Sequence, residues 1–116
     1  MNQREMKFRA WDDDHFEMLH IGDRLMNFRG YAVMQFTGLM DKNGKEIYEG
    51  DILNRLDRVG AVRWDDSGSW ACDWNDVAWN WRLPAFSGSE LEVVGNIYEN
   101  PEILPHEKVE INLNHQ

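Results

Sequence analysis

The sequence contains little cysteine, proline or positive charge. Its 116 residues include one cysteine and three prolines. A single cysteine excludes an internal disulfide framework and a zinc site built from several thiolates. Lys and Arg number 12 against 21 Asp and Glu, so the formal net charge is −9. This acidity argues against a nucleic-acid backbone or an anionic membrane surface as the main partner, and direct nucleic-acid binding is not expected.

Long apolar runs are also missing. The charge-free stretch 31–40 is about half the length of a spanning helix and contains Gln35, Thr37 and Gly38. The N-terminal basic residues are not followed by an apolar core, so no signal peptide is expected. We therefore expect one cytoplasmic domain over residues 1–116 without a membrane segment, with a polar tail over 106–116 that frays.

The sequence lacks motifs of catalysis and metal binding. It contains no GxSxG motif, no phosphate-binding loop and no dinucleotide glycine pattern. The run Asp12 to His15 offers metal ligands, but it lacks the spacing and the glycine of an EF-hand. His15 and His20 are five residues apart, so they share neither a helix face nor a strand face. We expect no cofactor and no metal, and we expect a protein that is not an enzyme, with a small hydrolase or nuclease as a distant alternative.

Strand-like alternation is what the sequence does contain. Apolar side chains recur with a period of two near the N-terminus and again over residues 62–83. Polar turn formers separate the alternating runs at 41–45 and 65–68, where Asn and Gly tolerate the positive φ of tight turns. The pattern predicts a mainly β fold. It favours a small SH3-like barrel or a curled antiparallel sheet with extra strands and at most a short helix.

Some local assignments are less sharply defined by the sequence. Residues 13–29 are the best helical candidate, although 16–21 also fit a strand. We expect a turn at Val59 and Gly60, a last strand over 91–98, and a bulge at Gly95 within that strand.

Three blocks of the sequence resemble one protein family. They occupy residues 4–12, 34–52 and 94–101, and contain Phe8-Arg9-Ala10-Trp11, Glu49-Gly50-Asp51 and Gly95-Asn96-Ile97-Tyr98 respectively. In this order they are similar to the YopX-like family of phage and prophage proteins. The resemblance spans residues 4 to about 104. It implies a phage or prophage origin, a family without assigned activity or cofactor, and a protein that forms homo-oligomers. It supplies no catalytic residues to transfer.

A dense group of tryptophans lies in the segment where the family resemblance gives least guidance. Five of the six tryptophans fall within 18 residues, namely Trp64, Trp70, Trp74, Trp79 and Trp81. Buried, they would stabilise a small sheet, because each aromatic side chain removes a large area from water. Exposed, they would form a surface for a protein partner, because tryptophan is enriched at binding hot spots. The sequence leaves both interpretations open.

Acidic residues accompany these tryptophans. Residues 64–107 contain nine acids and one base, and the acids nearest to the tryptophans are Asp65, Asp66, Asp73 and Asp76. Such a surface serves solubility or steers a basic partner. The leading hypothesis is a non-enzymatic accessory protein that self-associates and binds a phage or host protein. The candidate contact surface consists of the five clustered tryptophans and these four aspartates. The alternative is an acidic DNA mimic that inhibits a DNA-binding protein.

Overall fold

The chain is mainly β in its computed structural model, which describes residues 6–22, 30–56, 58–66, 68–74, 81–82 and 90–104. Within these ranges a single 3-10 turn, η3, accompanies the strands. The elements are β1 (Phe8–Asp12), β2 (Glu17–Gly22), β3 (Ala32–Met40), β4 (Glu46–Tyr48), β5 (Asp51–Arg55), β6 (Arg58–Asp65), β7 (Ser69–Trp74), β8 (Trp81–Arg82), β9 (Glu92–Asn96) and η3 (Pro101–Ile103).

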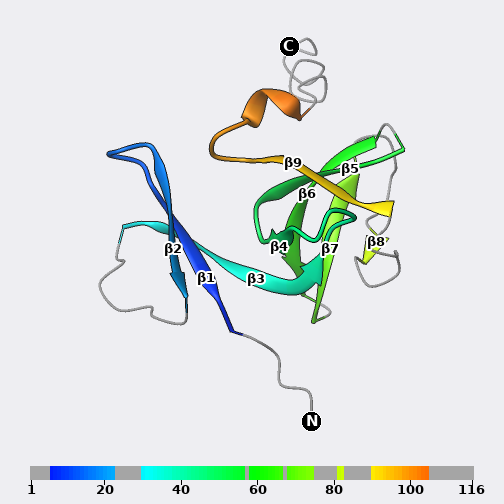
Figure 1. Cartoon of the computed structure of the whole chain (residues 1–116), viewed down its shortest axis with the longest axis horizontal. Coiled ribbons are helices and arrows are strands. Elements are labelled where there is room, and N and C mark those ends of the chain that lie inside the picture. The colour runs from blue at the N-terminus through cyan, green and yellow to red at the C-terminus, as the bar shows by residue number, and fades with distance from the viewer. Residues whose placement is uncertain are drawn as a thin grey trace, which may run out of the picture.

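The described strands form two antiparallel sheets that curl into a half-barrel. One sheet has the order β2-β1-β3-β4 and the other the order β8-β7-β6-β5-β9. Figure 1 shows β3 curving from the N-terminal hairpin towards the second sheet. Its partner β4, the last strand of the first sheet, lies beside that second sheet. The prediction of a curled antiparallel sheet is therefore confirmed. The long, curved β3 is the element that connects the two parts of the fold.

The core lies against the second sheet. Its buried residues are apolar side chains from β4 to β7 and the segment before β9: Ile47, Leu53, Val62, Trp70, Cys72, Trp74 and Leu91. Alternation explains this set, because the side chains at positions 70, 72 and 74 leave one face of β7 while Asp73 points to solvent. Burial of large aromatic and aliphatic side chains supplies the main driving force for folding.

The turn between β3 and β4 forms as the sequence predicts. Oδ1 of Asp41 accepts hydrogen bonds from the amides of Asn43 at 2.8 Å and Lys45 at 2.9 Å. Gly44 has a φ of 81°, which a residue without Cβ adopts at no steric cost. The other Asp41 oxygen accepts a bond from the amide of Val93 at 2.9 Å, so this turn also holds β9.

The predicted bulge in the last strand is confirmed. Ile52 pairs with Gly95 and Leu53 pairs with Val93, so the register shifts by one residue on β9. A Cβ at Gly95 would lie 2.7 Å from Oδ1 of Asn100. Gly95 therefore gives the loop after β9 space to fold back against the strand.

Two local predictions are wrong. The helical alternative for 13–29 is wrong over 13–22, where a turn and β2 form, and the strand alternative for 16–21 is confirmed; residues 23–29 lie outside the described residues. Val59 and Gly60 lie inside β6 instead of at a turn. The chain reverses just before them, where Leu56 has a φ of 50°. The signal for this turn in the sequence is limited to Asp57, and leucine at position 56 does not favour a positive φ.

Candidate functional site

Trp64 is the exposed tryptophan of the hairpin formed by β6 and β7. It pairs across the strands with Trp70, and the two ring centroids are 4.9 Å apart in an edge-to-face arrangement. Trp64 is 48% exposed, whereas Trp70 and Trp74 are each 5% exposed. Trp70 and Trp74 therefore belong to the core. The indole of Trp64 is half exposed to solvent and packs against the buried ring of Trp70.

The remaining predicted residues of this region are only partly described. Trp81 lies in β8, whose backbone pairs it with Cys72, but its side chain is not among the described parts. Trp79 and Asp76 lie outside the described residues. Their place in the predicted protein-contact surface stays a prediction.

An arginine balances much of the negative charge beside Trp64. Nε of Arg63 donates to both carboxylate oxygens of Asp73, at 3.0 and 2.9 Å, and its Nη1 lies 3.3 Å from Asp65. Asp66 is exposed at the end of the hairpin. The described hairpin residues 58–66 and 68–74 contain two arginines and three aspartates, so 2 − 3 gives a charge of −1. The exposed indole therefore lies in a nearly neutral polar rim.

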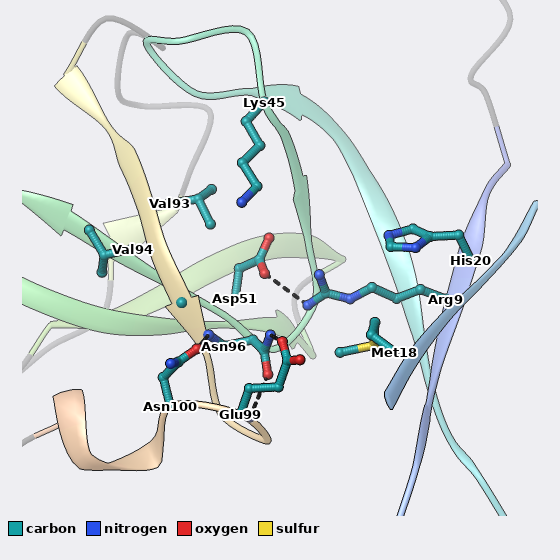
Figure 2. Close-up of a pocket in the computed structure, with 11 residues that line it drawn as sticks. Arg9, Met18, His20, Lys45, Asp51, Val93, Val94, Asn96, Glu99 and Asn100 are labelled. Carbon is teal, nitrogen blue, oxygen red and sulfur yellow. Dashed lines mark hydrogen bonds and ion pairs between the residues drawn. The ribbon is translucent and has the colours of Figure 1, made fainter. Parts of the chain in front are cut away.

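A cavity of about 400 Å³ lies between the N-terminal hairpin and β9. Figure 2 shows Arg9 and His20 entering from one side, Lys45 and Asp51 from the middle, and Asn96, Glu99 and Asn100 from β9 and the loop after it. Sequence reasoning did not find this site. The signal was nonetheless present, because each of the three blocks that resemble the family contributes to the wall.

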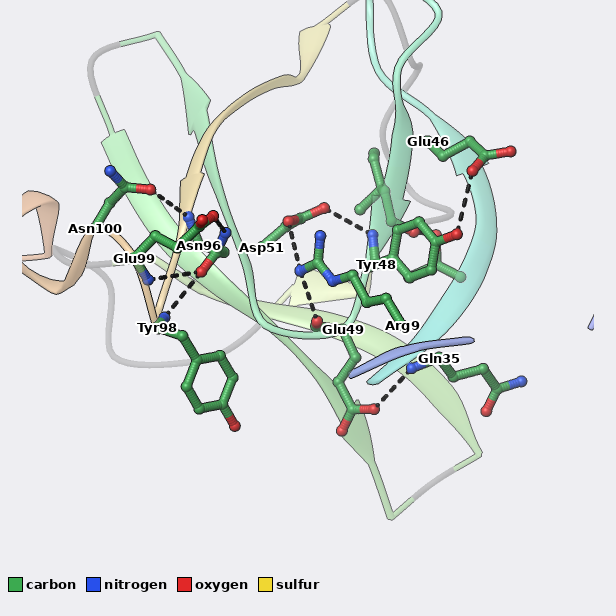
Figure 3. Close-up of polar contacts among 12 residues, drawn as sticks. Arg9, Gln35, Glu46, Tyr48, Glu49, Asp51, Asn96, Tyr98, Glu99 and Asn100 are labelled. Atoms are coloured by element: carbon green, nitrogen blue, oxygen red, sulfur yellow. Dashed lines mark hydrogen bonds and ion pairs between the residues drawn. The ribbon is translucent and has the colours of Figure 1, made fainter. Parts of the chain in front are cut away.

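A buried ion pair forms the floor of this cavity. Nη2 of Arg9 donates to Oδ1 of Asp51 at 2.8 Å and to the carbonyl of Glu49 at 3.2 Å. The Arg9 and Asp51 side chains are only 8% and 3% exposed. Asp51 also accepts the amide of Tyr48 at 2.7 Å, and the centroid of the Tyr48 ring lies 4.7 Å from the guanidinium carbon (Figure 3). These contacts fix the guanidinium and connect β1 to the turn before β5.

Burial and the ion pair act on Asp51 in opposite directions. Burial raises the pKa of Asp51 above its usual value, and the guanidinium of Arg9 and the amide of Tyr48 lower it by less. The balance is a raised pKa, so ionised Asp51 depends on its partners. Loss of Arg9 would leave a carboxylate with little compensation in a poorly solvated place.

The loop after β9 is held by side-chain hydrogen bonds. Oδ1 of Asn96 accepts the amides of Tyr98 at 3.0 Å and Glu99 at 2.8 Å, and its Nδ2 donates to Glu99 at 2.6 Å. Oδ1 of Asn100 accepts the amide of Asn96 at 3.1 Å. Figure 3 shows these bonds closing the loop beside the cavity. Asn96, Glu99 and Asn100 therefore have fixed positions in its wall.

Three titratable groups outside the cavity, Asp12, His15 and Cys72, lie at a turn or in the core. Nδ1 of His15 lies 2.8 Å from Oδ2 of Asp12, and this hydrogen bond raises the pKa of His15. The other Asp12 oxygen caps the amides of Asp14 and His15 in the same turn. Cys72 is fully buried, and burial raises the pKa of its thiol.

No group of three or more His, Cys, Asp or Glu side chains among the described residues is placed to hold a metal ion. Nor does the described part of the chain contain a helix long and apolar enough to cross a membrane.

Comparison with known proteins identifies the family. The YopX protein family model matches residues 23–105. The crystal structure of protein EF1440 from Enterococcus faecalis is similar, with 27% identity and a TM-score of 0.61, over 89% of this chain and 100% of that one. The search of curated proteins found no match. The chain therefore belongs to the YopX family, as the three sequence blocks indicate.

Proposed function

We propose that this YopX-family protein is a non-enzymatic accessory protein of a phage or prophage that self-associates and binds a protein partner in the bacterial cytoplasm. The observation that carries the proposal is Trp64, a half-exposed indole that packs edge-on against a buried tryptophan. Protein interfaces concentrate their binding free energy in such aromatic side chains.

The surroundings of Trp64 support this proposal. Its ring is held by Trp70, so little conformational entropy is lost when a partner covers it. The ion pairs of Arg63 with Asp65 and Asp73 lie beside it. An aromatic centre with a polar, charge-paired rim has the anatomy of a specific protein interface.

The acidic-mimic alternative receives less support from the hairpin. A DNA mimic needs an unbalanced row of negative charges, because its partner is built to bind phosphates. Arg63 engages two of the candidate aspartates, and the described hairpin carries a charge of −1. Among the described candidate aspartates, Asp66 and Asp73 are exposed, and Asp73 is paired with Arg63. The charged side chains therefore form the rim of the proposed interface, and the Trp64 indole forms its centre.

Sedimentation velocity on the full chain tests the proposal. The wild-type protein is expected to self-associate with rising concentration, and Trp64→Ala is expected to shift it to smaller species with a nearly unchanged melting temperature. Leu56→Ala is the matched control, because Leu56 is a 77% exposed apolar side chain on a different turn. Equal behaviour of the wild type and Trp64→Ala would refute the role of this surface in self-association.

A further inference from the structure

The cavity beside β9 contains a cation without a direct ion-pair partner among the described residues. Against the effect of burial, the charge of this residue, Lys45, lowers the pKa of Asp41 and of Asp51, although its ammonium donates no hydrogen bond to either carboxylate. Lys7 forms an ion pair with Glu46, and Lys42 lies 3.5 Å from Glu92. The ammonium of Lys45, in contrast, forms no hydrogen bond or ion pair within the described ranges, although it lines the cavity. Figure 2 shows its side chain extending towards Asp51. Lys45 therefore contributes to the wall a positive charge that no direct contact neutralises.

The cations and anions of the wall are not equivalent. Both oxygens of Asp51 already accept hydrogen bonds, from Arg9 and from the amide of Tyr48. Arg9 is neutralised by that pair, and both of its hydrogen bonds use Nη2. Its Nε is buried without a hydrogen-bond partner, and its Nη1 makes no bond to the described residues. Donors therefore exceed acceptors at this end of the cavity.

The wall of the cavity also contains an acceptor. One oxygen of Glu99 accepts Nδ2 of Asn96, and no bond to the described residues engages the other oxygen. Val93 and Val94 contribute apolar surface to the wall. A dianionic phosphate would face the carboxylates of Asp51 and Glu99, whereas a single carboxylate matches the one ammonium that lacks a direct partner. The volume of about 400 Å³ is at the lower end of the range for ligand pockets.

We propose that this cavity binds a carboxylate group, with the Lys45 ammonium as its ion-pair partner and the fixed Arg9 guanidinium as a second donor. A neighbouring N–H of the ligand would donate to Glu99. Both free N-acylated amino acids with acidic side chains and acidic peptide segments carry this combination. The inference goes beyond the proposed function, because Trp64 does not line the cavity.

Titrations of the full-length protein, followed by amide NMR shifts, test this site. The ligands are N-acetylglutamate amide, its neutral isostere N-acetylglutamine amide, and the capped tripeptide Ala-Glu-Ala. The acidic ligands are expected to shift the amides of Lys45 and Gly95, and to bind about tenfold more tightly than the isostere, because a charge-assisted bond is lost in the neutral ligand.

Two lysine variants separate the site from general charge effects. Lys45→Gln is expected to weaken binding of the acidic ligands about tenfold. Lys42→Gln is the matched control on the same turn, since Lys42 pairs with Glu92 and does not line the cavity. Lys42→Gln removes the same charge as Lys45→Gln and is expected to leave binding of the acidic ligands unchanged. Trp64→Ala is also expected to leave this binding unchanged.

Each outcome has a defined meaning. Tighter binding of the tripeptide than of the glutamate amide would assign the site to peptide segments, and weaker binding of the tripeptide would assign it to free carboxylates. Equal saturable binding of both would support recognition of the carboxylate and N–H unit that the two ligands share. Equal affinities of acidic and neutral ligands, or equal effects of the two lysine variants, would overturn the proposal. So would the absence of saturable shifts with any of the acidic ligands.

Discussion

Removal of the Arg9 guanidinium tests whether its ion pair with Asp51 stabilises the connection between β1 and the turn before β5. The guanidinium is 8% exposed and forms hydrogen bonds of 2.8 and 3.2 Å to Asp51 and to the carbonyl of Glu49. Arg9→Met keeps an apolar chain of similar length and removes the charge. Breaking a buried pair by removing one partner costs about 3–5 kcal/mol, because the other charge is left uncompensated. We expect a loss of stability in that range at pH 7 from urea unfolding.

The double variant Arg9→Met/Asp51→Asn separates the pair from its surroundings. The introduced side-chain amide oxygen would still accept the backbone amide of Tyr48, which now lies 2.7 Å from Oδ2 of Asp51. We expect the double variant to lose less stability than the two single variants combined, by about 2 kcal/mol, because neither charge is then left alone. Single-variant losses under about 1 kcal/mol that simply add would refute the reasoning.

The pH dependence of Arg9→Met supplies an independent check. Burial already raises the pKa of Asp51 above 3.8, and loss of the guanidinium raises it further. The folded state then binds more protons than the unfolded state at pH values between the two pKa values, so stability falls as pH rises through that window. The deficit of Arg9→Met relative to the wild type is therefore expected to be smaller at pH 4 than at pH 7. A deficit that does not change between these pH values would contradict the assignment.

Three further predictions concern single positions. Asp41→Ala should destabilise the protein by about 3 kcal/mol in urea unfolding, because three backbone amides, including that of Val93, lose a charged acceptor; a loss below about 1 kcal/mol would contradict this role. Gly60→Ala should lower stability by about 1–3 kcal/mol, because the added Cβ would lie 2.5 Å from the carbonyl oxygen of Asp73, and an unchanged melting temperature would exclude such a close approach. Cys72 should resist iodoacetamide at pH 8 until the protein is unfolded, because it is buried and its thiol pKa is raised; rapid labelling of the native protein would show that the thiol is accessible.

The parts of the fold that the sequence predicts are those with a local chemical cause. The turn at 41–45 follows from Asp, Asn and Gly, which satisfy or tolerate its backbone geometry. The alternation over β6 and β7 follows from the period of a pleated strand. The helix expected over 13–29 failed at β2 because the segment's apolar residues fit either period, and pairing with β1 decides between them.

The parts that it does not predict depend on contacts distant in sequence. Trp64 and Trp70 face each other in the ladder, yet one is half exposed and the other buried, because burial depends on what the next layer covers. Arg9 and Asp51 are 42 residues apart, and no local pattern pairs them. All three family-like blocks contribute to the wall of the cavity, but only the folded structure shows that they meet there.

Capture of partners from bacterial lysate tests the central claim most directly. Tagged wild-type protein and tagged Trp64→Ala would be used as parallel baits, eluted along a salt gradient, with bound proteins identified by mass spectrometry. Contacts centred on the indole persist at high salt, whereas contacts between exposed charges are screened. The account predicts a partner that remains bound to the wild type at high salt and is lost with Trp64→Ala. The same partners on both baits, or partners released from the wild type at moderate salt, would contradict it.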